Sequence, residues 1–470
     1  RSITEFTRLT PQANGNSFAG RDARYNNLQI DGANFNNGFG LSSDPLPGGA
    51  FQPISLDAIE EISVNIAPYD ITQSGFTGAG INAVTKSGTN QFHGSAYGYF
   101  NNQHLNGLKA RGNDIAYQEA AKKNIGFTIG GPIIKDKLFF FVSGEQEQAS
   151  GANASGANLW RSSENGVSNA EQNITRVKTS DLDAVRSHLQ NQWGYDAGEY
   201  EGYADEAKQK GTKFLARIDW NINEKHKFAL RYNQLSGNSN SLVNGNSGPR
   251  PRSSHNRVSE NSMAFQNANF SNENTIKSIT AELNSSFSSV LSNKFLATYT
   301  RIQDTRVPNG SLFPFVDIWD GNVGSNGAVG TNNYMSFGTE LFSYKNDVIN
   351  DNYSFTNNLT LNLGKHTITG GAAFELQKFG NSYVRMGTSY YRYGSVTDFL
   401  TTGTANEVAP IMFGLTYPYE GQDGYARVNF GLGSLYAQDK IALSDRFNVT
   451  VGLRAELPIY LNKLTANSSI

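Results

Sequence analysis

Apolar and polar residues alternate one by one along many short stretches of this chain. In one stretch Phe214, Ile218 and Trp220 alternate with Arg217 and Asp219. A period of two places successive side chains on opposite faces of a β-strand, so each stretch predicts a strand with one apolar and one polar face. About eleven candidates follow Gln91, at residues 92–101, 124–131, 138–147, 214–220, 227–233, 276–287, 294–303, 358–363, 367–376, 435–443 and 447–454.

Short and long connections between these strands alternate without a break. The short ones are 132–136, 223–225, 289–293, 364–365 and 444–446, and the long ones are 102–121, 150–211, 236–275, 304–351 and 378–429. A membrane β-barrel has short periplasmic turns and long extracellular loops, so the pattern predicts an all-β, antiparallel transmembrane barrel. A soluble array of β-sandwiches with lectin-like binding is the alternative, although it has no reason to sort its loops by length.

Composition is consistent with a barrel and removes several other classes. Gly (48 residues) and aromatic residues (12%) suit strands and turns. The longest run of bulky apolar residues, Leu138–Val142, is far shorter than the roughly 20 residues of a spanning helix. A net charge of −2 argues against nucleic acid as a partner. The absence of Cys excludes disulfides and thiolate metal sites.

The sequence contains no recognisable catalytic or metal-binding constellation. The six His are scattered, and there is no nucleophile elbow or Walker-type loop. We therefore expect neither an enzyme nor a cofactor or metal. The acidic pairs Glu60–Glu61 and Glu145 with Glu147 are expected to be solvated. Asp22 and Asp31 lie in Gly- and Asn-rich turns, which Asx-turn chemistry explains more simply than calcium.

Two motifs near the N-terminus resemble the plug of TonB-dependent transporters. Residues 59–64 read Ile-Glu-Glu-Ile-Ser-Val, and 78–90 contain Gly-Ile-Asn-Ala-Val-Thr-Lys. In that family an Ile-Glu-x-Ile-x-Val strand precedes a Gly-x-Ile-Asn-x-Val-Thr-Lys segment, and the barrel begins just afterwards, here at 91–97. Residues 65–70 replace the family's usual Arg-Gly-Pro. This variant, together with residues 20–27 and 30–33, is similar to the Oar-like subfamily, and residues 435–439 and 451–454 resemble a strand pair that recurs across these transporters.

The resemblance implies a barrel of about 22 strands around a small α/β plug. Residues 1–90 would be the C-terminal part of the plug, and residues 91–470 the N-terminal half of the barrel. The remaining strands and the start of the plug are expected outside this chain. Polar contacts with the lumen would hold the plug, so that it can move without exposing an apolar core.

The resemblance also implies a function in the outer membrane of a Gram-negative bacterium. That function is active transport of a large substrate, a peptide, a protein or an oligosaccharide. Periplasmic TonB, with its inner-membrane energising complex, would gate the plug through a segment not in this chain. Outer-membrane lipid surrounds such a barrel, and a surface lipoprotein or other outer-membrane subunits are further candidate partners. The alternative is a non-transporting surface barrel that acts as an adhesin or scaffold subunit.

Two groups of residues are candidates for these roles. For plug–barrel contacts, ordinary solvated charge is the alternative, and the candidates are Arg21, Arg24, Glu60 and Glu61 in the plug and Arg217, Arg231 and Arg454 in the lumen. For loops that face a substrate or partner, exposed aromatic residues are favoured at binding surfaces. Loops that fold on themselves are the alternative there, and the candidates are Phe313, Phe315, Trp319, Tyr383, Tyr390, Tyr391, Tyr393, Tyr417 and Tyr419.

Overall fold

The computed structural model describes most of the chain in well-placed segments. These are Ile3, Thr7 and residues 9–14, 17–22, 25–36, 51–66, 70–73, 78–105, 109–110, 113–114, 120–151, 158–202, 208–321 and 332–462. No helix within these ranges is both long enough and apolar enough to cross a membrane.

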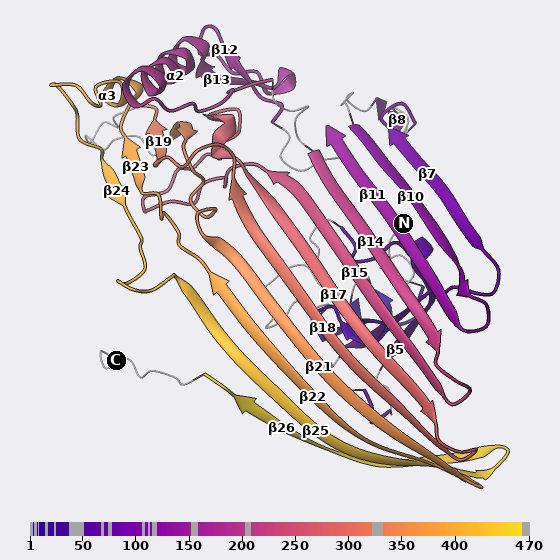
Figure 1. The fold of residues 1–470 in the computed structure, drawn as a ribbon. Coiled ribbons are helices and arrows are strands. Elements are labelled where there is room, and N and C mark those ends of the chain that lie inside the picture. The colour runs from indigo at the N-terminus through magenta and orange to yellow at the C-terminus, as the bar shows by residue number, and fades with distance from the viewer. Residues whose placement is uncertain are drawn as a thin grey trace.

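A single antiparallel sheet of eleven strands dominates the structure (Figure 1). Its order, β26-β25-β22-β21-β18-β17-β15-β14-β11-β10-β7, follows the chain without a crossover, which confirms the predicted barrel topology. The strands are β7 (His93–Asn102), β10 (Ala120–Ile134), β11 (Leu138–Gly151), β14 (Lys208–Asn221), β15 (His226–Ser241), β17 (Phe270–Ser286), β18 (Leu291–Pro308), β21 (Asn346–Leu363), β22 (His366–Ser382), β25 (Tyr425–Ser444) and β26 (Phe447–Tyr460).

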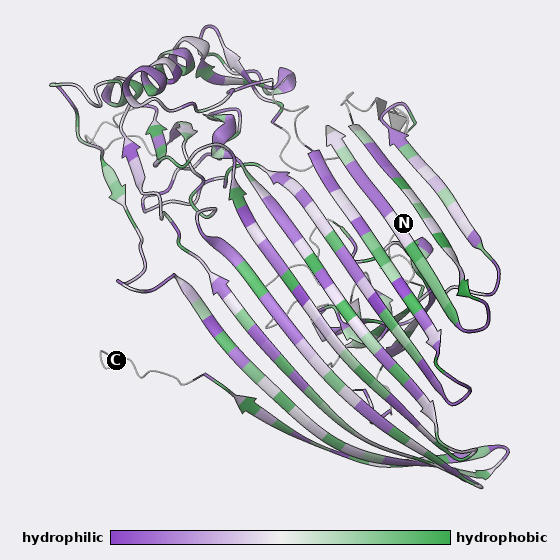
Figure 2. Cartoon of the chain, in the orientation of Figure 1, coloured by the Kyte–Doolittle hydropathy of each residue, from purple (hydrophilic) through white to green (hydrophobic). Residues whose placement is uncertain are grey.

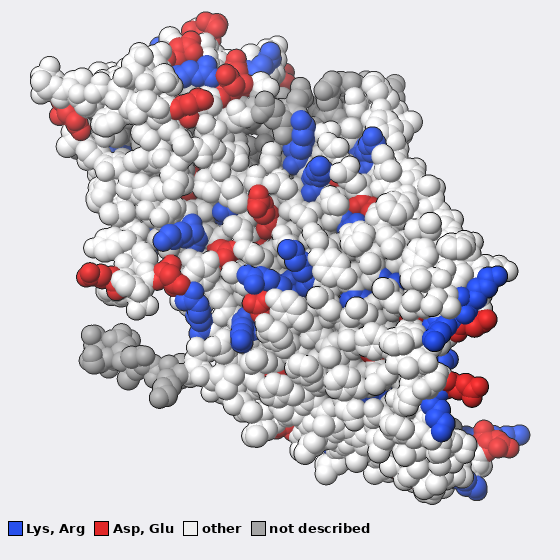
Figure 3. Space-filling model, viewed as in Figure 1, with Lys and Arg blue, Asp and Glu red and all other residues white. Residues whose placement is uncertain are grey.

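Side chains on the two faces of this sheet meet different surroundings. On β14, Phe214 is 40% exposed and Ile218 41%, whereas Leu215 between them is 3% exposed and packs towards the plug. Figure 2 shows the same alternation of hydrophobic and hydrophilic residues along the strands. In Figure 3 charged side chains lie at the turns, on the loops and over the half of the strands nearer the loops, and a largely uncharged area covers the strands near the turns. This is the pattern of a sheet with one apolar face turned to lipid.

The strands extend beyond the stretches that alternation predicted. The candidate at 124–131, for example, lies inside β10, which pairs with β11 from Ala120 to Ile134. The added residues are Ala-Ala-Lys-Lys at one end and Pro-Ile-Ile at the other, and neither run alternates between apolar and polar residues. The tight connections hold residues with positive φ, Asp136 (61°) and Gly364 (60°), as short hairpin turns require.

The N-terminal residues form a small separate sheet against one face of the large one (Figure 1). An Asp31-Gly32 turn, with φ of 50° and 83°, joins β3 to β4, as expected of a two-residue hairpin. The sheet order is β4-β3-β6-β5, with β3 (Asn27–Ile30), β4 (Ala33–Asn34), β5 (Ile59–Ile66) and β6 (Ala79–Thr85); beside it lie β1 (Ala13–Asn14), β2 (Ser17–Phe18) and the 3₁₀ helix η3 (Leu56–Ala58).

The apolar core of this plug is continuous with the wall of the large sheet. One buried cluster joins plug residues such as Leu28, Ile54 and Ile81 to wall residues. The wall residues are Phe141, Leu215, Leu235, Ile276 and Ile302. The expectation that polar contacts alone hold the plug is therefore wrong, because inward-facing apolar side chains on β11 to β18 complete its core.

The long connections fold together at one end of the large sheet. They contribute a mixed five-stranded sheet, β16-β20-β19-β23-β24, drawn from three separate connections. We call this assembly the loop domain; it comprises the described residues of 158–202, 242–269, 309–345 and 383–424. Its elements are β12 (Arg161–Ser163), η4 (Ala170–Gln172), β13 (Ile174–Lys178), α2 (Thr179–Trp193), β16 (Met263–Ala264), η6 (Gln266–Ala268), β19 (Phe315–Trp319), β20 (Asn333–Phe337), β23 (Tyr390–Tyr393), α3 (Val396–Phe399) and β24 (Met412–Gly414). The first connection also contains a short hairpin of β8 (Lys109–Ala110) and β9 (Asn113–Asp114).

Helix α2 covers this small sheet. Leu182, Val185 and Leu189 recur at helical spacing on one side of α2 and are fully buried. They join a core that contains Phe265, Ile318 and Phe337 from the sheet. Gly194 ends the helix in a left-handed conformation, with φ of 61°. The loop domain therefore has its own hydrophobic core.

A charge on the outward face should destabilise the barrel. Leu230 faces outward on β15, opposite Ile218 of β14. We expect Leu230→Lys to lower the free energy of unfolding by up to about 2–4 kcal/mol in lipid, the range for a cation near the bilayer midplane. Urea titration in lipid vesicles measures this loss. Leu230→Ala is the control, because it removes the side chain without adding charge. Equal losses from both variants would contradict a lipid-facing position.

Candidate functional site: the plug contacts and the loop domain

Three arginines on the inner face of the sheet contact the plug. Nη1 of Arg217 donates to the carbonyl oxygen of Thr85 at 2.7 Å, and Nη1 of Arg454 donates to the carbonyl oxygen of Ile71 at 3.1 Å. Nε of Arg231 lies 3.5 Å from Oδ2 of Asp31 in an ion pair. The structure thus brings all three predicted lumen residues to the plug. Their role in gating stays a prediction.

A barrel carboxylate orients each of these arginines. Nε of Arg217 lies 2.8 Å from Asp219, and Nε of Arg454 lies 2.7 Å from Glu456. Nη1 of Arg231 donates to Glu282 of the neighbouring strand at 3.0 Å. Two of these pairs have i, i+2 spacing, which places both charges on the same strand face. That spacing is visible in the sequence, where Arg217 precedes Asp219 and Arg454 precedes Glu456 by two positions.

The plug residues at these contacts differ from those predicted. Arg21, Glu60 and Glu61 are exposed, and Arg24 lies outside the described residues. The strand β5 has a register irregularity between Ile59 and Glu61. Glu60 and Glu61 are exposed to solvent there, which agrees with the expectation that this acidic pair is solvated. Their assignment as plug–barrel contacts stays a prediction; among the described residues, the plug carboxylate that reaches a lumen arginine is Asp31.

The turn between β3 and β4 holds Asp31 in place. Its Oδ1 accepts from the backbone N–H of Thr85 at 3.0 Å, and its Oδ2 accepts from the hydroxyl of Thr85 at 2.6 Å. The carboxylate therefore ties two plug strands together before it meets Arg231. These partners account for Asp31 without a cation.

A second polar cluster joins the plug to β7, β11 and β14. Ser55 of the plug donates to Oε2 of Glu145 at 3.0 Å, and the hydroxyl of Tyr97 donates to the same oxygen at 2.7 Å. Nζ of Lys213 lies 2.8 Å from Glu145 and 2.6 Å from Glu147. The expectation that Glu145 is solvated is wrong, since its side chain is buried and paired with Lys213. The sequence alone could not reveal this cluster, because its residues come from three different strands whose register is set only in the folded sheet.

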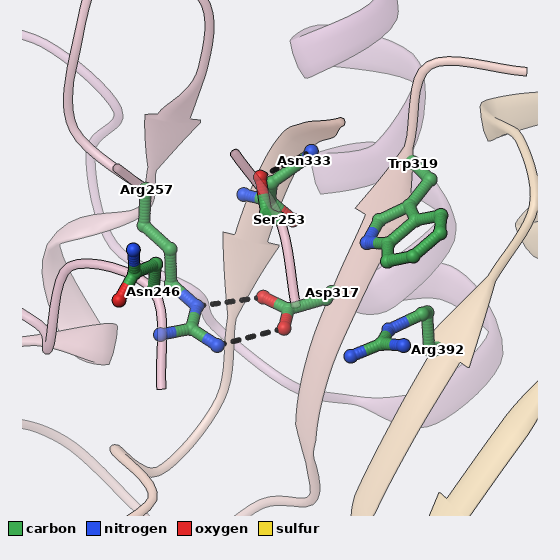
Figure 4. Close-up of a pocket in the computed structure, with 7 residues that line it drawn as sticks. All are labelled: Asn246, Ser253, Arg257, Asp317, Trp319, Asn333 and Arg392. Carbon is green, nitrogen blue, oxygen red and sulfur yellow. Dashed lines mark hydrogen bonds and ion pairs between the residues drawn. The ribbon is translucent and has the colours of Figure 1, made fainter. Parts of the chain in front are cut away.

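A buried ion pair stabilises the centre of the loop domain (Figure 4). Nε and Nη2 of Arg257 bind the two oxygens of Asp317, each at 2.8 Å. Ser336 and Tyr390 donate hydroxyl hydrogen bonds to the same carboxylate at 2.7 and 2.8 Å. Arg392 in turn donates to the hydroxyl of Tyr390 at 2.9 Å. Both arginines are thus fixed in place by the strands β19, β20 and β23.

The two arginines also pin a neighbouring backbone segment. Arg392 donates to the carbonyl oxygens of Pro249 and Pro251, each at 2.9 Å. Arg257 donates to the carbonyl oxygens of Asn244 and Ser247 at 2.6 and 2.7 Å. Five donors in a fixed fork suit arginine to this task. The network therefore joins three connections of the barrel into one unit.

Electrostatics keeps Asp317 ionised within this core. Burial alone would raise the pKa of Asp317, but the charge of Arg257 and the hydrogen bonds from Arg257, Ser336 and Tyr390 outweigh burial. The pKa of Asp317 consequently lies below its usual range. Burial raises the pKa of the nearby Glu340, and the hydrogen bonds it accepts only partly offset this.

Most of the aromatic residues predicted to face a substrate are inside the loop domain. Phe315 and Tyr390 are fully buried, and Trp319 and Tyr393 nearly so. The guanidinium of Arg392 lies 4.3 Å from the Trp319 ring centre. These four assignments are corrected, because the loops fold on themselves and use the rings as core.

The other predicted aromatic residues divide into two groups. Phe313 and Tyr391 are partly buried and pack against the core. Tyr383, Tyr417 and Tyr419 are exposed, the last two at 76% and 89%. A role in binding remains a prediction for these three. Exposure could not be read from the sequence, because buried and exposed tyrosines occur within one connection.

A cleft opens on the loop domain between α2, α3 and the ends of β19 and β20. Its volume is about 500 Å³. Arg176, Lys178, Asp181 and Asp320 contribute charge to its lining, and Tyr334 contributes an aromatic ring. Arg176 pairs with Asp320 at 3.1 Å, and the hydroxyl of Tyr334 donates to Asp181 at 2.8 Å. Sequence patterns gave no indication of this cleft, because its lining comes from three connections.

Comparison with known families agrees with this fold. Residues 84–468 match a family model described as outer membrane beta barrel domain. Within the chain, 152 residues are 31% identical to the TonB-dependent transporter Oar of Myxococcus xanthus. That match covers 30% of this chain and 14% of the Myxococcus protein.

Solved structures with a similar fold include two outer-membrane proteins. The outer membrane transporter YddB of Escherichia coli aligns with a TM-score of 0.58 at 13% identity, over 95% of this chain and 50% of that one. A mutant of the ferric enterobactin receptor PfeA of Pseudomonas aeruginosa aligns at 0.51 and 13%, over 97% and 55%. The chain spans about half the length of both. At such identities the similarity concerns the fold.

Breaking the buried pair should unfold the loop domain before the barrel. We expect Arg257→Ala to lower its free energy of unfolding by about 3–5 kcal/mol, because Asp317 is left buried without its partner. Trp fluorescence during thermal unfolding in detergent measures the loss. Arg186→Ala is the control; it removes a far more exposed pair with Glu199 and should cost about 0–1 kcal/mol. Equal losses would contradict a special role for the Arg257 pair.

The same pair should make the loop domain sensitive to acid. The folded-state pKa of Asp317 lies below its value in the unfolded chain, about 3.9, so the unfolded state binds the proton more tightly. The stabilisation should be complete above about pH 5 and be lost as the pH falls towards the folded-state pKa. The raised pKa of Glu340 acts with the opposite sign, so the titration is made in a Glu340→Gln background. A transition temperature unchanged down to pH 3 would contradict the assignment.

Proposed function

The chain belongs to the outer membrane β-barrel domain family, and from that membership we propose that it works in TonB-dependent transport across the outer membrane of a Gram-negative bacterium. The three lumen arginines that contact the plug are the observation that carries this proposal. A barrel that served only as a scaffold would have no need of a domain inside its lumen that three arginines of the wall contact. The similarity to the Oar transporter supports the same function.

The proposed transport cycle needs a partner that supplies energy. Periplasmic TonB, with its inner-membrane complex, would act through a part of the protein outside this chain. Force on the plug would then break the contacts of Thr85, Asp31 and Ile71 with the lumen arginines. Each is one or two hydrogen bonds or ion pairs, and a single hydrogen bond contributes modestly to stability.

We further propose that the loop domain captures a large substrate, a peptide, a protein or an oligosaccharide. The cleft of about 500 Å³ lies in the size range of small-ligand sites and could hold one end of such a molecule. Its lining offers both signs of charge, hydroxyl groups and an aromatic ring. Tyr383, Tyr417 and Tyr419 would add contact area outside the cleft.

A second candidate function is docking of another protein without transport. The exposed residues Ile411, Phe413 and Leu415 alternate along and beside β24, the edge strand of the loop sheet, and Tyr417 and Tyr419 continue the series. An exposed apolar edge is a site for strand pairing with a partner. This feature favours an adhesin or scaffold subunit, such as one that holds a surface lipoprotein.

Energised opening of the plug distinguishes the two functions. Ala83 is buried on β6, and residues 1–470 contain no Cys, so Ala83→Cys introduces the one thiol of this segment, and labelling of the unsubstituted protein is subtracted as background. In cells that express the natural gene with this change, a membrane-impermeant maleimide should label the thiol during respiration. A protonophore or deletion of TonB should abolish the labelling. Glu420→Cys, on an exposed loop, should be labelled under all conditions. Labelling of Ala83→Cys that does not depend on TonB would favour the scaffold function over transport.

The substrate class can be tested with two probes of matched size. Fluorescein-labelled tryptic peptides of casein and fluorescein-labelled dextran are offered to cells with and without the gene. If the substrate is a peptide, we expect uptake of the casein peptides alone, at least twofold above the deletion strain and dependent on TonB. Dextran uptake alone would assign the oligosaccharide class. Uptake of neither probe, with normal labelling of Ala83→Cys, would exclude both classes while leaving transport intact.

A further inference from the structure

One short plug segment lies flat against the barrel wall. We call residues 51–55 the anchor segment; four of the five are buried. The carbonyl oxygen of Pro53 accepts from Nδ2 of Asn233 on β15 at 3.1 Å. Ser55 reaches Glu145 on β11 and Tyr97 on β7. The segment therefore crosses the wall from β15 towards β7.

Phe51, the first residue of this segment, packs its ring against a pair of glycines. Gly211 of β14 and Gly237 of β15 are directly opposite each other in the register. They lie on the strand faces that also carry Leu215 and Leu235 towards the plug. A Cβ atom on either glycine would lie 2.5 Å from a ring carbon of Phe51, which is too close for any real contact. The pair thus forms a notch that only glycine can line, and the Phe51 ring fills it.

Within the eleven described strands, the apolar residues around this notch lie on β11 to β18. Ile54 of the anchor segment belongs to the cluster that includes Phe141, Leu215 and Leu235. Ile276 and Ile302 extend the cluster to β17 and β18. Among the described residues, no side chain of β21, β22, β25 or β26 belongs to it.

The described contacts on the other side are fewer, and most of them are polar. Nδ2 of Asn34 donates to Glu375 of β22 at 3.5 Å, and the N–H of Ile71 donates to Gln438 of β25 at 3.3 Å. Arg454 also donates to the carbonyl oxygen of Ile71, and the Ile71 side chain packs against Gly452 of β26, where an added Cβ atom would lie 2.8 Å from its Cδ1. Water can replace each of these hydrogen bonds, whereas separating Phe51 from its notch exposes apolar surface on both partners.

We propose that Phe51, seated between Gly211 and Gly237, anchors the plug to the wall of β11 to β15, so that the plug opens along β22 to β26. The anchoring needs only the structure, and the direction of opening rests on the proposed transport function. Phe51 is in this view a positioning residue. It keeps one side of the plug in place while the other side moves, and it returns the plug to register afterwards.

Thiol labelling of the detergent-extracted natural protein tests the anchor without a substrate. Ala58→Cys places a reporter in η3 next to the anchor segment, and Ile71→Cys places one on the polar side. In rising urea below the unfolding of the barrel, the Ile71→Cys thiol should react with maleimide first. Gly211→Ala or Gly237→Ala should speed labelling of Ala58→Cys by about ten- to hundredfold, the range that overpacking gives.

The controls separate the notch from a general weakening of the barrel. Gly98→Ala and Gly370→Ala add the same methyl group to barrel strands where nothing lies within 4 Å, and they should leave labelling unchanged. Heat-modifiable migration on gels reports whether the barrel is intact. If a notch variant fails to assemble, Phe51→Ala, which leaves the wall untouched, should give the same acceleration. Notch variants that label like the controls, or an Ala58→Cys thiol that reacts before Ile71→Cys, would overturn the proposal. Failure of TonB-dependent labelling in cells would instead count against transport and leave the anchor standing.

Discussion

The structure depends on one constraint: a backbone N–H or C=O group in the hydrocarbon of a bilayer needs a partner inside the protein. Within the described sheet, the strands from β10 to β25 meet it by pairing on both sides with their neighbours in the chain, and β7 and β26 form its two edges. Once the backbone is paired, the two faces are free to differ. The outer face carries residues such as Phe214 and Leu230, and the inner face is left to serve the plug.

The inner face is not uniformly polar. On one part of the wall, glycines and leucines pack against the anchor segment. On another part, single polar side chains form hydrogen bonds with other residues of the plug. The lumen arginines lie between these extremes, each held by a carboxylate of its own strand or the next. Close packing and replaceable hydrogen bonds thus coexist on a single sheet, and they divide the plug into a side that is held firmly and a side that is not.

The barrel strands can be predicted from the sequence for two reasons. Apolar and polar residues alternate along the strands, and short and long connections alternate between them. The plug motifs at residues 59–64 and 78–90 can be recognised because each is a short continuous stretch of sequence. Contacts between strands that are distant in the chain cannot be predicted in this way. Glu145 is an acidic residue in a polar stretch until Lys213 and Ser55 are placed beside it. Phe315 and Tyr417 are both aromatic loop residues, and only folding of the loop domain buries one and exposes the other. Asp31 belonged to a recognisable turn, but its pairing with Arg231 required the docking of the plug.

The loop sheet also has a consequence for biogenesis. Its strands β16, β19, β20, β23 and β24 come from connections that are separated in the chain by whole barrel hairpins. Contacts between such distant segments form late, because the intervening chain must first be ordered. The Arg257–Asp317 pair can therefore close only after the β17–β18 hairpin between its two loops has formed and brought them together. A molecule that recognises the folded loop domain would accordingly distinguish a finished barrel from an assembly intermediate at the cell surface.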